Sequence, residues 1–168
     1  TICKDSRLRR NKLPCYKTDQ ALKQLGDKIA QKYYPNLKLV KICYMFRDEA
    51  AVTQGRVVAG QTSRVDDRNR TLHDYDFIVE IAQDIWDDCS DKFKEALMDH
   101  ELAHCGIHYE ADGIAPRMDE KTNRVKTYVV HHEIEEFSPI LERHGAYHKE
   151  LRTFLTAFAK SKTGKSDE

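Results

Sequence analysis

The chain has 168 residues, which is enough for one domain with a sizeable hydrophobic core. Basic and acidic residues both number 28, so the net charge is zero and no overall field would attract the protein to nucleic acid or to anionic lipid. No apolar run approaches the ~18 residues that a membrane span needs, so we expect no membrane partner.

The five cysteines indicate a reducing compartment. Their number is odd and no two stand in a C-x-x-C pair, so we expect free thiols in the cytoplasm and not a disulfide framework. Cys105 directly follows a histidine that could bind a metal, but that histidine already occupies the ligand position on the helix. We therefore expect Cys105 to be a buried free thiol.

The first predicted elements are a basic N-terminal arm and a helix. Residues 1–17 carry six Lys and Arg against one Asp, and we interpret them as a solvated terminus in preference to an arm that touches phosphate. Thr18 and Asp19 then begin a helix that ends near Pro35. Its expected inner face consists of Ala21, Leu22, Leu25, Ile29 and Ala30.

Three predicted strands follow this helix. Alternation in residues 37–46 predicts a strand whose even-numbered side chains, the more apolar set, face the core. A second strand is expected at residues 56–65, followed by a polar loop at 66–70. Residues 76–82 form a third strand of near-continuous apolar content. A connection then leads into the next helix.

That helix carries an H-E-x-x-H motif at residues 100–104. Ser90 is its expected N-cap and Gly106 its expected stop. Apolar residues and the two histidines recur at helical spacing, so we expect one stripe to point the histidines inward. The stripe consists of Phe93, Ala96, Leu97, His100 and His104.

The two histidines of the motif could bind one metal ion. Four residues apart on a helix, their Cβ atoms lie about 6 Å apart on one face. Glu101 stands roughly 100° round the helix from His100, where it can act on a metal-bound water without being a ligand. Two His ligands, a third ligand from elsewhere and a Glu general base are the arrangement of zinc hydrolases. The alternative is two unrelated histidines on a surface helix.

A catalytic zinc ion needs a third protein ligand. Residues 124–130 are expected to be extended, and His131 and His132 to begin a helix with Phe137 on its inner stripe. Adjacent helical residues point about 100° apart, so only one of the two histidines can serve. Spacing alone slightly favours His131, which lies nearer the apolar stripe.

The chain ends in a helix and a tail. Residues 149–160 are expected to form an amphipathic helix, and residues 161–168 a polar, disordered tail. The apolar face of the helix consists of Leu151, Phe154, Leu155 and Phe158. We expect residues 18–160 to form a single domain between the basic arm and this tail.

Three segments together resemble a family of phage metallopeptidases related to the SprT-like zincins. They are the strand at 76–81, the motif segment at 96–105, and a His-acidic-x-acidic-acidic-Phe box at 132–137 followed by Gly145. The resemblance spans roughly residues 37–145. It implies an α+β fold with a zincin-like core: an N-terminal helix, a small three- to four-stranded sheet, the H-E-x-x-H helix and C-terminal helices.

The resemblance also implies that His132 is the third ligand, because it matches the ligand position of the box. Glu133 stands where Asp is commoner in the family, a departure that concerns the surroundings of the ligand. Glu135 and Glu136, three and four residues after His132, are expected to hold its imidazole N–H. Glu136 is also the second choice for the third ligand, and a solvated helix face is an equal interpretation of the pair.

The function expected from these residues is that of a zinc-dependent metallopeptidase. His100, His104 and His132 would hold Zn²⁺, and Glu101 would activate a zinc-bound water that attacks a peptide bond of a peptide or protein substrate. The alternative is a zinc-stabilised, non-catalytic effector module that binds a host protein or DNA. Nucleic-acid binding through the basic arm has weak support because the net charge is zero. The expected location is the cytoplasm, that of the host if the protein is phage-encoded.

Overall fold

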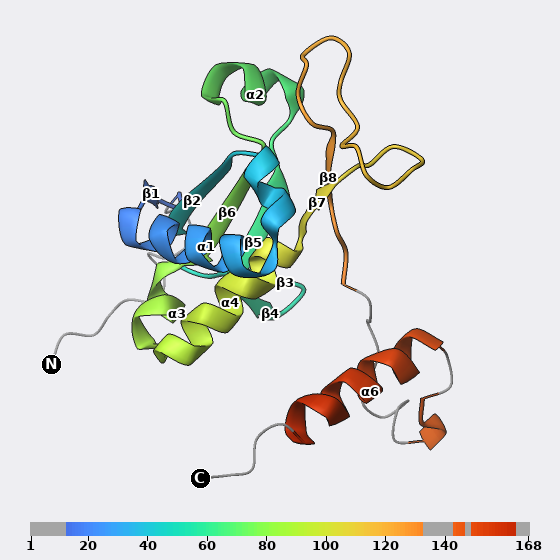
Figure 1. Cartoon of the computed structure of the whole chain (residues 1–168). Coiled ribbons are helices and arrows are strands. Elements are labelled where there is room, and N and C mark those ends of the chain that lie inside the picture. The colour runs from blue at the N-terminus through green and yellow to red at the C-terminus, as the bar shows by residue number, and fades with distance from the viewer. Residues whose placement is uncertain (1–12, 133–142, 147–148, 164–168) are drawn as a thin grey trace, which may run out of the picture. The chain divides into compact units, whose positions relative to one another are not determined.

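The computed structural model describes residues 13–132, 143–146 and 149–163. The chain forms two compact units that divide between Val130 and His131. The expectation of a single domain over residues 18–160 stays a prediction. Figure 1 draws the described residues as helices and strands of a mixed α+β protein.

A four-stranded sheet forms the centre of the first unit. Its strands are β1 (Tyr16–Thr18), β2 (Ile42–Arg47), β6 (Phe77–Ala82) and β5 (Gly60–Arg64), in the order β1-β2-β6-β5. β2 and β6 are parallel, whereas β1 and β5 run antiparallel to their neighbours. β5 therefore lies at one edge of the sheet, and β1, which contains the end of the predicted basic arm, lies at the other.

Helices α1 (Gln20–Tyr33) and α4 (Asp91–Ala103) cover one face of this sheet (Figure 1). Asp19 caps α1 by accepting a hydrogen bond from the backbone N–H of Leu22, as the sequence predicts. The core between helices and sheet includes Leu22, Ile29, Tyr44, Phe46, Phe77, Val79, Ile81, Met98 and Leu102. This confirms that the even-numbered side chains of the strand around Tyr44 face the core.

The predicted strand boundaries need two corrections. The strand expected from residue 37 begins at Ile42, because Pro35–Leu39 form a 3₁₀ helix (η2) with Pro at its start. The strand expected at 56–65 is divided. Its first part, β4 (Arg56–Val58), pairs with β3 (Ala51–Thr53) in a hairpin that turns at Gly55, where φ is +76°, and its second part is β5.

The polar loop expected at residues 66–70 is wrong, because this segment begins helix α2 (Asp67–His73). Asp66 caps the helix by accepting from the Asn69 N–H at 3.0 Å. The Arg70 side chain is buried, with its guanidinium on the carboxylate of Asp76 and on the carbonyl oxygen of Val125. A second short helix, α3 (Gln83–Asp88), occupies the predicted connection after β6.

A two-stranded ribbon follows α4. β7 (Cys105–Ile107) pairs antiparallel with β8 (Thr127–Val129), which confirms the extended segment expected at residues 124–130. The expectation that Gly106 stops the motif helix is wrong, because α4 ends at Ala103 and Gly106 lies within β7, opposite Tyr128. A β-carbon on Gly106 would lie 2.7 Å from the Tyr128 ring, so the close approach of the two strands requires glycine there.

The second unit contains helix α6 (Lys149–Thr163), which extends three residues beyond the predicted end. Leu151 is buried, whereas Phe154, Leu155 and Phe158 are exposed. His131 and His132 are not helical, so the predicted helix does not begin there. The rest of that helix, with Phe137, Glu135 and Glu136, lies outside the described residues, as do residues 1–12 and 164–168. Within the described part of the chain, no helix is long and apolar enough to span a membrane.

Candidate metal centre

The end of α4 brings two histidines together. Ser90 caps the helix through its hydroxyl, which accepts from the Phe93 N–H at 3.3 Å, as predicted. His100 lies in the last turn and His104 is the C-terminal cap. Their rings meet edge to face, with centroids 5.1 Å apart and planes at 82°. The spacing of four residues therefore places both imidazoles at one point of the surface.

The predicted inward-facing stripe of this helix is largely wrong, although its member Leu97 packs against the core. Phe93 and Ala96 are exposed, and the buried residues of α4 are Met98, Glu101 and Leu102. Met98 and Leu102, four residues apart, pack into the core, so α4 turns His100 toward solvent. The histidine pair consequently lies at the border of the core, with Glu101 on its buried side.

A backbone carbonyl orients His104. Nδ1 of His104 lies 2.5 Å from the carbonyl oxygen of Val130, and the Val130 N–H donates to the His104 carbonyl at 2.9 Å. Because a carbonyl oxygen can only accept, Nδ1 must carry the proton, which makes Nε2 the basic nitrogen of the ring. Metal-binding histidines commonly donate their second ring N–H in this way, so His104 fits the role of a ligand.

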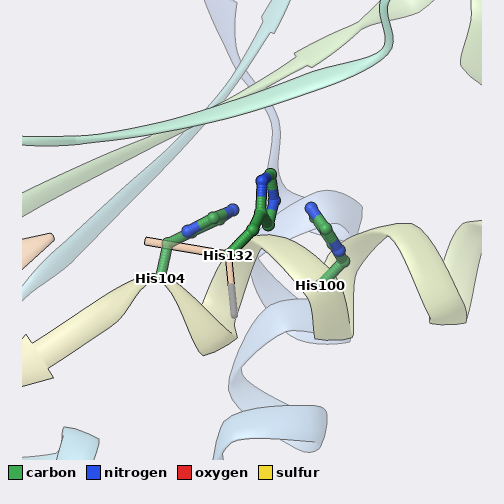
Figure 2. Close-up of side chains that lie close together, drawn as sticks. All are labelled: His100, His104 and His132. Atoms are coloured by element: carbon green, nitrogen blue, oxygen red, sulfur yellow. The ribbon is translucent and has the colours of Figure 1, made fainter. Parts of the chain in front are cut away.

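The same pairing brings a third histidine close. His132 follows Val130 by two residues, and one potential ligand atom from each of His100, His104 and His132 lies within 4.8 Å of the others. Figure 2 shows the three rings converging, two from α4 and the third from the segment after β8. Among the described residues, His131 is not part of this cluster, and His108 instead packs its ring on Tyr128 with centroids 4.5 Å apart.

The electrostatics of the cluster suit a cation. Partial burial lowers the pKa of His100 below its ordinary value, and the nearby His104 lowers it further. His100 is therefore neutral at pH 7, which is the form in which imidazole binds metals. Cys105 is free and buried, as predicted, and burial together with the charge of Glu101 raises the pKa of its thiol to about 12. Three imidazoles without a thiolate are a donor set that fits zinc.

Two residues that sequence reasoning missed contact Glu101. Glu101 is 3% exposed, and the hydroxyl of Thr62 lies 2.8 Å from its Oε2 atom. A β-carbon on Gly60 would lie 2.6 Å from Oε1, so glycine leaves room for the carboxylate. Both residues belong to β5, about forty positions before Glu101, and no local pattern relates the two segments.

Fold and geometry together define a mixed α+β protein with a three-histidine cluster that could hold a metal ion beside a buried glutamate. Comparison with known families agrees with a metal-binding protein. A family model described as "Putative phage metallopeptidase" matches residues 15–159, and the chain belongs to this family. Searches of curated proteins and of solved structures found no match.

Proposed function

We propose that the protein is a zinc-dependent metallopeptidase that hydrolyses a peptide bond with Glu101 as general base. The observation that carries this proposal is the convergence of three imidazole nitrogens within 4.8 Å of one another, with the buried Glu101 directly following His100 in helix α4. A purely structural zinc site is closed by a fourth protein ligand and needs no base. The presence of Glu101 therefore favours catalysis over a non-catalytic effector module.

Each residue has a role in this proposal. His100, His104 and His132 would hold the ion, with His104 binding through Nε2 because its Nδ1 donates to Val130. A bound zinc ion supplies Lewis acidity, which polarises the substrate carbonyl and acidifies a water molecule. Glu101 accepts a proton from the attacking water and donates it to the leaving amine.

The edge strand β5 is the proposed binding surface for the substrate backbone. Among the strands of the described residues, β5 is paired with β6 alone. Thr62 of this strand contacts Glu101, so a peptide that adds to the unpaired edge of β5 would pass beside the general base. Backbone pairing of this kind accepts many sequences, because it uses hydrogen bonds common to all residues.

The surrounding fold supports a zincin-like core, with α1 and a four-stranded sheet ahead of the motif helix. Kinship with the SprT-like enzymes is part of the same proposal. Four cysteines, Cys15, Cys43, Cys89 and Cys105, are free, which fits the reducing cytoplasm of a host cell.

Metal analysis of the purified protein tests the site. We expect about one zinc ion per chain in the wild type, by mass spectrometry and by zinc titration. His100→Ala, His104→Ala and His132→Ala should abolish tight binding. His108→Ala and His131→Ala, which remove neighbouring histidines outside the cluster, should retain it. A wild type that binds no zinc on titration would overturn the proposal.

Peptide cleavage by Glu101→Gln tests catalysis separately from metal binding. This variant should bind zinc as the wild type does but cleave a library of fluorogenic peptides at least ~100-fold more slowly, the usual effect of losing a general base. If wild type and variant cleave at equal rates, Glu101 is not the base. If zinc binds and neither protein cleaves any peptide, the effector interpretation replaces the enzyme.

A further inference from the structure

Strand β5 contacts the side chain of Glu101 at two points. The Thr62 hydroxyl oxygen lies 2.8 Å from Oε2 of Glu101 and 2.8 Å from the Glu101 backbone carbonyl oxygen. Both residues are buried, at 9% and 3% exposure, so water competes little for these contacts. A hydrogen bond from a hydroxyl to a carboxylate in such surroundings is among the stronger ones in proteins.

Gly60 makes the second contact, two residues earlier and on the same face of β5. A β-carbon at this position would lie 2.6 Å from Oε1 and 2.9 Å from both Cδ and Cγ of Glu101. Real β-carbons do not approach other atoms so closely, so any larger residue would displace the Glu101 side chain or the strand. Gly60 and Thr62 thus enclose the carboxylate from the side of the sheet.

We propose that Gly60 and Thr62 are positioning residues that hold the carboxylate of Glu101 in its working place beside the histidine cluster. This inference rests on the proposed function, because it gives the two residues a role in orienting the general base. A glutamate has three side-chain torsions, whereas threonine is β-branched and its backbone is fixed by pairing with Val79 in the sheet. The rigid Thr62 therefore restricts the flexible side chain of Glu101.

The single hydroxyl proton of Thr62 can be donated to either of its two acceptors. Both acceptors belong to Glu101, one in its side chain and one in its backbone, so the hydroxyl stays bonded to this residue with either choice. A misplacement of the base by about 1 Å can cost 100-fold in rate.

Substitutions on β5 test this role. Thr62→Val removes the hydroxyl at nearly constant shape, Thr62→Ser retains a hydroxyl, and Ser63→Ala is the control because Ser63 lies on the opposite face of the strand. With a peptide that the wild type cleaves, Thr62→Val should lower kcat about 10- to 100-fold, with KM changed less than about twofold and zinc content unchanged. Thr62→Ser should restore most of kcat, and Ser63→Ala should change nothing.

A second measurement needs neither substrate nor metal. The carboxyl carbon of Glu101, labelled with ¹³C and assigned through Glu101→Gln, should shift its NMR resonance in metal-free Thr62→Val and return in Thr62→Ser. If the wild type binds no metal or cleaves no peptide, the proposed function fails, but a shift restored by serine would still support the positioning contact. An unchanged resonance in Thr62→Val overturns the inference. So does a loss of kcat that is accompanied by loss of zinc, or that Ser63→Ala reproduces, because the effect is then one of folding.

Discussion

At His104, one ring and one backbone carbonyl connect the metal cluster to the ribbon β7–β8. The Nδ1–H of His104 donates to Val130, and the Val130 N–H donates back to the carbonyl of His104. The first bond selects the ring nitrogen available for a metal, and the second continues the pairing of the two strands. His132 comes two residues later, so the partner that orients one imidazole also brings the next one near.

Cysteine reactivity should follow burial. Burial raises the pKa of the Cys43 thiol, and Cys105 is 6% exposed, whereas Cys15 is exposed. Because the thiolate is the reactive form, iodoacetamide at pH 7.5 should modify Cys15 and leave the two buried cysteines intact. Peptide mapping by mass spectrometry before and after denaturation measures this. Modification of Cys105 in the native protein at the rate of Cys15 would contradict the burial of Cys105.

At the scale of elements, the close packing of β7 on β8 fixes the end of the motif helix. Gly106 lies beneath the ring of Tyr128, and an added β-carbon would lie 2.7–2.8 Å from three ring atoms. We therefore expect Gly106→Ala to lower the free energy of unfolding by about 1–3 kcal/mol, the usual cost of overpacking. Because the same ribbon holds Val130 against His104, zinc affinity should fall as well.

A double variant provides the control for this prediction. Gly106→Ala/Tyr128→Ala removes the ring that the new methyl group meets, so its stability should exceed the sum expected from the two single variants. Urea unfolding of the four proteins measures the coupling between the two positions. Strict additivity would mean that the cost of alanine at 106 comes from the strand backbone and not from the tyrosine ring.

Elements defined by local pattern could be predicted from the sequence. The capped helix at Asp19, the apolar strand at 76–82 and the Ser90 cap of the motif helix all follow from nearest neighbours along the chain. Helix α2 has a local cap at Asp66, but the burial of its Arg70 depends on a remote partner, the carbonyl oxygen of Val125, which the sequence pattern does not reveal. A polar stretch reads as a loop when its long-range partners are unknown.

The candidate site also has residues that the sequence predicts and residues that it does not. The spacing of His100, Glu101 and His104 predicts that they lie within about one helical turn, and the family resemblance predicts His132 as the third ligand. Gly60 and Thr62 could not be found, because their relation to Glu101 depends on the register of an edge strand against a helix. The orientation of His104 was equally hidden, since it depends on a backbone carbonyl that any residue at position 130 would supply.

Across the first unit as a whole, a network of charged side chains connects the sheet to the segment that leads to the metal cluster. Asp76, at the start of β6, accepts from Arg70 at 3.1 Å and lies 3.3 Å from Arg124. Arg124 in turn donates to the carbonyl of Arg70 at 3.0 Å, and it precedes β8. The strand that ends beside Val130 is therefore held to the central sheet by the buried Arg70 and Asp76 and by the half-buried Arg124. A substitution that breaks this network should therefore affect the histidine cluster although it changes no histidine.

Metal binding should stabilise the folded chain, because the three histidines come together only in the native state. At a free zinc concentration 100 times the Kd, the free energy of unfolding should rise by about 2.7 kcal/mol, and EDTA should reverse the change. Thermal unfolding of wild type, His132→Ala and His131→Ala, each with zinc and with EDTA, measures this. We expect the shift in the wild type and in His131→Ala, which keeps the cluster, and no shift in His132→Ala.

The pH dependence of the same shift has a definite sign. Protons compete with zinc for imidazole nitrogens, so the zinc-dependent rise in Tm should diminish as the pH falls below about 6. In the metal-free protein the pKa of His100 is lower than in the unfolded chain, so the unfolded state binds the extra proton first. The contribution of His100 to stability is therefore complete above its unfolded pKa and is lost as the pH falls from that value through the lower folded pKa. A zinc-dependent shift of equal size at pH 5 and pH 7.5, or one that His132→Ala retains in full, would show that the ion binds elsewhere.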